Sequence, residues 1–323
     1  LTDVDFADSE VPISLNRQFN SSWNVNGALD LSGLGGAVKF NGISGNSAGT
    51  INLGANTLTM TDAADEFAGA ISGSGGINLT AGNLKLSGIN TYSGGTTVDA
   101  SAGVASTLTI TSAGALGTGG LALIGSATVP ATLATTSSMT INNAITVSGD
   151  PVFNVAPGTV TTIASSITNG TSPGDVIVDG GGTLAFTAAN TYTGLTNVLA
   201  GSTLALVGNG GISALSPLTN SGTFDITGAT GSVTLHSFTQ TASGNLAMNL
   251  SQSLVLNGST SLAGGLVLNL VPGNYVPGNY TFLTSPGGLN GSFSNLARTI
   301  SSVTPLAYNL GYNATDAYLT FYN

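Results

Sequence analysis

Charged side chains are scarce in this sequence. Asp, Glu, Lys and Arg make up 6% of its 323 residues, against about 25% in an ordinary soluble domain. The basic residues are only Arg17, Lys39, Lys85 and Arg298. Nucleic-acid binding needs several phosphate contacts from Lys and Arg, and anionic membrane surfaces attract clusters of the same residues. We therefore expect no nucleic-acid partner and no direct membrane binding.

Cysteine is absent, which excludes disulfides and thiolate metal sites. No apolar run approaches the 18 or more residues that a membrane-spanning helix requires. The chain begins at Leu1, with neither Met nor a signal peptide, so we expect a mature or excised segment of a longer protein.

Small residues dominate what is present. Gly (47), Thr (44), Ser (37) and Asn (30) make up nearly half of the chain. Hydrophobic residues still account for 41%, and the mean hydropathy is +0.34, whereas disordered chains combine low hydropathy with high charge. Because Gly, Asn, Thr and Ser are poor residues for helix interiors, the composition predicts a folded, turn-rich, all-β chain.

The sequence repeats itself at a distance of 100 residues. The first copy reads Leu84-Lys-Leu-Ser-Gly-Ile-Asn-Thr-Tyr-Ser-Gly-Gly-Thr-Thr-Val98, and the second reads Leu184-Ala-Phe-Thr-Ala-Ala-Asn-Thr-Tyr-Thr-Gly-Leu-Thr-Asn-Val198. Each copy has alternating apolar residues, an Asn-Thr-Tyr turn and a second short alternation. Similar alternations of three to six residues, separated by Gly, Asn or Ser, continue along the chain and predict many short strands.

Short strands, few charges and an internal repeat together favour a right-handed parallel β-helix over a sandwich or barrel. Each turn of about 20–25 residues would place its strands on those of the turn before, which gives about 13–16 turns. Thr, Ser and Asn are expected to form outward ladders. The residues expected to stack inward are Leu84, Leu86, Val98, Leu184, Phe186, Val198, Leu204 and Leu206.

The segment from Gly82 to Val98 resembles the passenger-associated repeat of bacterial autotransporters, the proteins of type V secretion. The second copy continues this similarity through Ala200-Gly-Ser-Thr-Leu-Ala-Leu206 but lacks the Ser-Gly before its Asn. The stretches from Gly278 and from Gly288 to Phe293 are similar to the C-terminal end of such passengers. The resemblance implies a β-helical passenger exported to the bacterial surface or released outside the cell, here without its membrane translocator barrel.

The C-terminal part differs in composition, since nine of the 20 aromatic residues fall between Tyr275 and Tyr322. A solenoid end needs a capping element, and bulky aromatic side chains can cover it. We therefore divide the chain into β-helix rungs at 1–265 and an aromatic-rich C-terminal cap at 266–323. The resemblance adds that such a region can act as an autochaperone that nucleates folding.

Catalytic candidates are few. A Ser-His-Asp protease would have to use His236, the only histidine, and no Gly-x-Ser-x-Gly context supplies a nucleophile. Glycan-cleaving enzymes place several carboxylates together, and the nearest approach here is Asp175 with Asp179, on one face of a predicted strand. Turn or strand-end roles fit all three residues better, so we expect no enzyme and no catalytic residue.

Metal and phosphate sites are equally thin. Acidic clusters occur at Asp3, Asp5, Asp8 and Glu10, and at Asp62, Asp65 and Glu66. Oxygen ligands suit Ca²⁺, but solvated loops explain both clusters better. Gly73-Ser-Gly75 is followed by Asn78 where a dinucleotide motif has a third Gly or Ala. Sequons such as those at Asn20 and Asn169 occur no more often than chance gives. No cofactor is expected.

Two classes of function remain, with a polysaccharide-acting enzyme as a distant third. The first is a surface adhesin or self-association module, whose partners would be host-cell surface or matrix components, glycans or another copy of the chain. The second is a stalk that presents an upstream domain. For an adhesin, we expect contact patches at the turns that carry Tyr92 and Tyr192.

Overall fold

The structure, a computed structural model, describes residues 3–6, 11–12, 21–35, 37–126, 128–270, 275–300 and 307–322. The chain divides into two compact units, residues 1–174 and residues 175–323. Both consist of short strands joined by turns, and the single helical element of the described residues is the 3₁₀ turn η1 (Ala113–Leu116). The expected all-β class is therefore confirmed.

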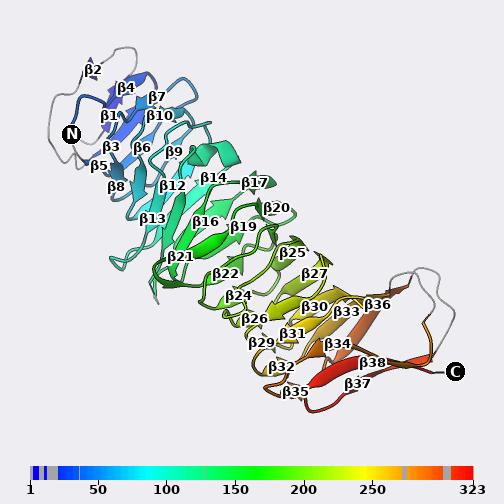
Figure 1. Cartoon of the computed structure of the whole chain (residues 1–323). Coiled ribbons are helices and arrows are strands. Elements are labelled where there is room, and N and C mark those ends of the chain that lie inside the picture. The colour runs from blue at the N-terminus through cyan, green and yellow to red at the C-terminus, as the bar shows by residue number, and fades with distance from the viewer. Residues whose placement is uncertain are drawn as a thin grey trace. The chain divides into compact units, whose positions relative to one another are not determined.

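The N-terminal unit consists of parallel ladders (Figure 1). One ladder contains β5 (Val38–Phe40), β8 (Leu58–Met60), β11 (Ile77–Leu79), β13 (Thr96–Asp99), β15 (Leu121–Ile124), β18 (Ile145–Gly149) and β21 (Ile167–Gly174). A second contains β9 (Glu66–Phe67), β12 (Gly82–Leu86), β14 (Ser106–Ile110), β16 (Ala131–Thr135) and β19 (Val152–Val155). Shorter ladders contain β1 (Asp3–Phe6), β3 (Ser22–Val25) and β6 (Gly42–Ser44); β2 (Val11–Pro12), β4 (Ala28–Asp30), β7 (Thr50–Asn52) and β10 (Ala70–Ser72); and β17 (Met139–Ile141) and β20 (Val160–Ile163).

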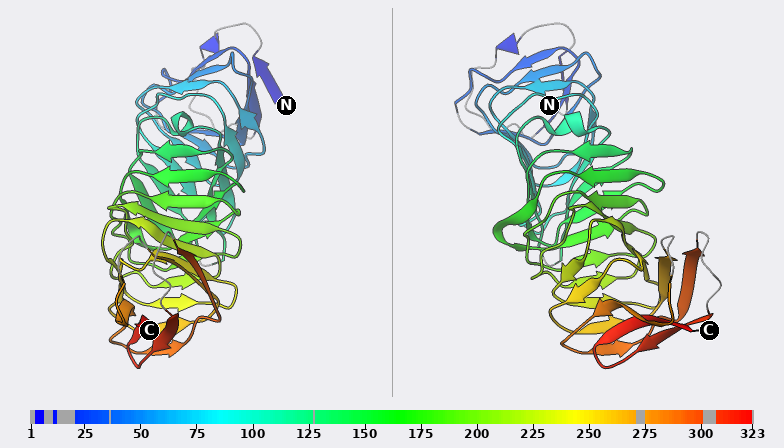
Figure 2. Two further views of the ribbon diagram at one scale, coloured as in Figure 1. Left: turned by 90° about the vertical axis from the view of Figure 1, so that its right-hand side faces the viewer. Right: turned by 45° about the vertical axis from the view of Figure 1, so that its right-hand side comes forward.

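The C-terminal unit repeats this arrangement, with its strands stacked upon one another (Figure 2). One ladder contains β22 (Val176–Asp179), β24 (Thr196–Val198), β26 (Leu218–Asn220), β29 (Phe238–Gln240), β32 (Thr260–Leu262) and β35 (Leu289–Gly291). A second contains β23 (Thr183–Phe186), β25 (Thr203–Gly208), β27 (Thr223–Ala229), β30 (Asn245–Asn249), β33 (Gly265–Leu270) and β36 (Asn295–Ile300). The third contains β28 (Val233–Leu235), β31 (Leu254–Leu256), β34 (Gly278–Thr284), β38 (Asp316–Tyr322) and β37 (Ala307–Tyr312).

The pairing register shows the coil of a parallel β-solenoid. Thr96 pairs with Ile77, 19 residues earlier, and with Leu121, 25 residues later. The chain makes about 11 turns, fewer than the 13–16 expected, because the final turns are longer: Thr260 pairs with Leu289, 29 residues on. The parallel solenoid is confirmed, while its right-handed sense stays a prediction.

Apolar side chains stack in register inside each unit. Leu84 of β12 pairs with Leu108 of β14, which pairs with Leu133 of β16. In the other unit, Leu184 of β23 pairs with Leu204 of β25. All eight residues expected to face inward are at most 1% exposed. Strict alternation along a strand puts every second side chain on one face, and this period made the core predictable.

Polar ladders occur, but the best-shielded ones point inward. The side chain of Asn220 donates to Oε1 of Gln240 at 3.1 Å, and Oγ1 of Thr196 lies 3.1 Å from Oγ of Ser216. All four residues are at most 2% exposed. The sequence analysis placed such ladders on the outside only. Because these buried groups bond from turn to turn, they satisfy one another where water is excluded.

The prediction of exposed contact patches at Tyr92 and Tyr192 is wrong, since both side chains are fully buried. Each phenol bonds inside the molecule, Tyr92 to Thr96 and Tyr192 to Thr196. A tyrosine ring carries a large apolar area together with one polar atom. Turning it inward removes that area from water while the threonine satisfies the hydroxyl.

The C-terminal unit ends in a change of strand direction. β34 continues the parallel ladder of β31, but β38 pairs with it antiparallel, and β37 pairs antiparallel with β38. Figure 2 draws β37 and β38 in red beside the orange β34. Tyr275, Tyr280 and Phe321 lie together there, with ring centroids 5.0–5.5 Å apart. These contacts indicate an aromatic cap only weakly, and the boundary between 1–265 and 266–323 stays a prediction.

Candidate functional site

His236 lies in the exposed turn between β28 and β29. Its backbone N–H donates to the carbonyl of Ser216 at 3.3 Å, and its own carbonyl accepts from the N–H of Gly258 at 2.6 Å. A catalytic imidazole needs a carboxylate to orient it, and the described residues hold no ion pair or acidic cluster that contains His236. Its contacts fit the expected turn role.

The pair Asp175 and Asp179 flanks the apolar part of β22, as its spacing predicted. Oδ1 of Asp175 accepts from the backbone N–H of Leu195 at 2.7 Å, which joins one turn to the next. Oδ1 of Asp179 accepts from the N–H of Gly180 at 2.7 Å. Each carboxylate therefore binds backbone amides of a turn, and this arrangement favours the structural role over an active site.

The acidic cluster around Glu66 carries an ion pair. The carboxylate of Glu66 accepts from Nζ of Lys85 at 2.9 Å and from Oγ of Ser87 at 2.5 Å. The bond from Ser87, and then that from Lys85, lowers the pKa of Glu66. Asp62 and Asp65 are exposed. Among the described residues, no three acidic or histidine side chains gather in a way that could hold a metal ion.

The other predicted sites are turns or lie outside the described residues. Gly75 needs no phosphate to explain it, because a Cβ there would collide with the carbonyl oxygen of Asn56 in the neighbouring turn. Asn169 lies in β21. The structure describes only the backbone of Asp3 and Asp5, so the N-terminal acidic cluster and the sequon at Asn20 lie outside the described side chains.

Asn90 is a residue whose role the sequence analysis missed. It is 4% exposed; its Oδ1 accepts from the backbone N–H of Ile71 at 2.8 Å, and its Nδ2 donates to the carbonyl of Ala115 at 2.6 Å. One side chain thus links its own turn to the turn before and the turn after. Its repeated position, as Asn90 and Asn190, was the one signal in the sequence that could have marked it.

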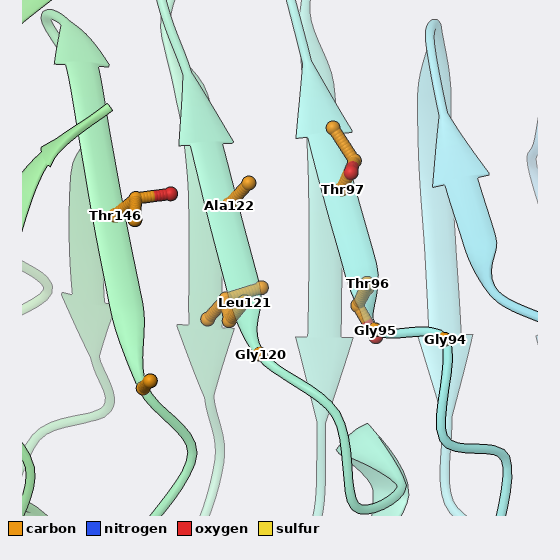
Figure 3. Close-up of a pocket in the computed structure, with 9 residues that line it drawn as sticks. Gly94, Gly95, Thr96, Thr97, Gly120, Leu121, Ala122 and Thr146 are labelled. Carbon is orange, nitrogen blue, oxygen red and sulfur yellow. The ribbon is translucent and has the colours of Figure 1, made fainter. Parts of the chain in front are cut away.

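An open groove of about 280 Å³ lies on the outer face of β13, β15 and β18. Thr97, Ala122 and Thr146 come from these three strands in matching register (Figure 3). Gly94, Gly95 and Gly120 line its end, as do further small residues. No residue that lines this groove is ionisable at neutral pH. The groove can therefore accept and donate hydrogen bonds, but its side chains cannot serve as the acid and base of a hydrolase.

A second outward row has the same character. Thr107 of β14 pairs with Thr132 of β16, and Thr109 pairs with Ala134 two residues further along. All four side chains are partly exposed. Adjacent strands lie about 4.8 Å apart, so the row presents hydroxyl and methyl groups at a regular spacing.

Comparison with protein families identifies the repeated element. The model of the passenger-associated transport repeat matches residues 81–103 and 176–206. These segments contain Asn90 with Tyr92, and Asn190 with Tyr192. The comparison with curated proteins gives no match. No helix among the described residues is long and apolar enough to span a membrane.

Proposed function

Because the two transport repeats and the parallel solenoid fit the passenger domain of an autotransporter, we propose that this chain is a non-enzymatic adhesin or self-association module. The repeat family implies secretion to the cell surface or the extracellular space. The partners that we propose are host-cell surface or matrix components, glycans or a second copy of the chain.

The regular outward rows of neutral hydrogen-bonding groups support this proposal best. The row from Thr97 to Thr146 carries no formal charge and stays accessible along three consecutive strands. Each hydrogen bond to a partner contributes little, about 0.5–1.5 kcal/mol. A surface that repeats such groups binds through many weak contacts at once.

This mechanism predicts an unusual salt dependence. The chain has a net charge of −10, so two copies repel one another weakly, and added salt screens that repulsion. Beads coated with the isolated chain should aggregate, and aggregation should persist or rise as NaCl increases from about 0.01 to about 1 M. A steep fall over this range would show that ion pairs hold the copies together and would contradict the mechanism.

The alternative is a structural stalk that presents an upstream domain. The turn-to-turn bonds of residues such as Asn90 stabilise the coil and would serve a stalk equally well. Beads that neither aggregate nor bind cells or matrix at any salt concentration would support the stalk. An enzyme that acts on polysaccharides stays the third candidate, and release of reducing ends from a polysaccharide panel would reveal it.

A further inference from the structure

A polar groove of about 500 Å³ lies at the surface of the N-terminal unit. We call it the asparagine groove and define it by Asn24, Asn26, Gly45, Asn46, Glu66 and Ala68. Three side-chain amides and one carboxylate therefore face a single open space. No other groove among the described residues combines an ionised side chain with amides.

Successive turns of the solenoid bring these residues together. Asn24 lies on β3, which pairs with β6, and Gly45 follows β6 and forms a bridge to Phe67 of β9. A Cβ at position 45 would collide with the carbonyl oxygen of Val25. Glycine therefore lets the backbone approach closely here and keeps the floor of the groove shallow.

The amides of the groove are held in place through their oxygens. Oδ1 of Asn24 accepts from Nδ2 of Asn26 at 3.1 Å, and Oδ1 of Asn26 accepts from the backbone N–H of Asn46 at 2.9 Å. Oδ1 of Asn46 accepts from the N–H of Ala48 at 2.8 Å. Within the described residues, Nδ2 of Asn24 and Nδ2 of Asn46 have no partner, so each amide offers free N–H donors in a fixed position.

Glu66 supplies the complementary acceptors. Lys85 and Ser87 each donate one hydrogen bond to its carboxylate, and a carboxylate has about four acceptor sites. These bonds lower the pKa of Glu66, so it is ionised at neutral pH. The ammonium of Lys85 balances its charge. The groove therefore presents fixed donors and acceptors with almost no net charge.

We propose that the asparagine groove binds a neutral glycan, an inference that rests on the proposed adhesin function and specifies one of its ligands. A sugar carries vicinal hydroxyls, each of which donates and accepts, and it can bond to the Nδ2 groups and to Glu66 together. A cation would face N–H donors, because the amide oxygens are already bonded. An anion would face the carboxylate. The fixed amides also reduce the ordering cost of binding.

The test uses the whole chain and a panel of neutral oligosaccharides built from glucose, galactose, mannose and N-acetylglucosamine, with sialylated and sulfated counterparts, CaCl₂ and inorganic phosphate. Binding is followed by saturation-transfer NMR and by isothermal titration. We expect at least one neutral glycan to bind. The double variant Asn24→Asp/Asn46→Asp keeps an oxygen for each fixing bond but loses the free N–H donors, and should weaken binding by about tenfold or more.

Asn83→Asp is the matched control, because Asn83 is exposed on β12 of the same unit outside the groove and gains the same charge. It should bind the glycan as the unchanged chain does. The proposal is wrong if no neutral glycan binds, if the control weakens binding as much as the double variant, or if only Ca²⁺ or anionic ligands bind. Bead aggregation separates this result from the proposed function: wild-type beads that aggregate without binding any neutral glycan leave the adhesin standing and remove the groove.

Discussion

The phenolic oxygen of Tyr192 lies 2.7 Å from Oγ1 of Thr196, and the same bond joins Tyr92 to Thr96 at 2.5 Å in the other copy of the repeat. The two bonds differ in their surroundings. Oγ1 of Thr196 also lies 3.1 Å from Oγ of Ser216, whereas Thr96 has no further side-chain partner among the described residues. This difference distinguishes the two copies energetically.

Replacing each tyrosine by phenylalanine tests this relationship. Tyr192→Phe removes one hydrogen bond and should lower the free energy of unfolding by about 0.5–1.5 kcal/mol. Tyr92→Phe leaves the buried Thr96 hydroxyl unsatisfied and should cost more, about 1–3 kcal/mol. Urea denaturation measures both values. Tyr322→Phe, at a tyrosine that is 46% exposed, serves as the control, and equal losses in all three variants would contradict the assignment.

The buried phenols also predict the behaviour of the chain in alkali. Burial raises the pKa of Tyr92 from 10.0 to about 12, and the pKa of Tyr192 rises as well. Their contribution to stability is complete below pH 10. Above that pH the unfolded chain releases protons that the folded chain retains, so stability falls as pH rises toward 12, by about 2–3 kcal/mol for Tyr92.

Urea denaturation at intervals between pH 8 and pH 12 follows this loss. Tyr92→Phe should flatten the decline, since phenylalanine has no proton to release. An equally steep decline in this variant would show that other groups cause it.

The stacked core should not tolerate charge. Leu86 is fully buried on β12 and pairs with Ile110 of β14. Leu86→Asp buries a carboxylate without a partner and should cost several kcal/mol, about 2–7. Thr109→Asp, on the outward face of β14, should change the melting temperature little. Near wild-type melting of the Leu86 variant would refute the inward assignment.

Close contact between turns should require glycine at position 69. A Cβ there would collide with the carbonyl oxygen of Gly49 and with the ring of Phe67. Gly69→Ala should therefore destabilise the chain by about 1–3 kcal/mol. Gly35→Ala is the control, because its Cβ would meet nothing within 4 Å. Thermal unfolding of both variants distinguishes this collision from a general effect of alanine.

Removal of residues 266–323 tests the cap. This truncation deletes β34 to β38 and most of β33, and it leaves the edges of β30 and β31 without their partners. Unpaired edges and an open solenoid end favour aggregation, so the truncated chain should refold incompletely and aggregate in light-scattering measurements. If it refolds as fast and melts as high as the whole chain, these C-terminal strands do not act as a cap.

The sequence by itself determined the fold class and the inward positions. Alternation at residues such as Leu84 and Leu86 has a period of two, which is local and can be read without knowing any partner strand. The Asn-Thr-Tyr repeat, local as well, identified the family resemblance. The sequence also showed that charge could supply little of the surface chemistry.

Only the tertiary structure decided which residues of different turns meet. The spacing between stacked positions varies, for example from 19 to 25 residues around Thr96, so no fixed offset in the sequence predicts a column. The bonds of Asn90 to Ile71 and Ala115 depend on these offsets, as does the meeting of Asn46 with Glu66 in one groove. Tyr92 lies in a turn, where alternation no longer fixes the direction of a side chain, and its burial follows from the threonine that packing places beside its hydroxyl.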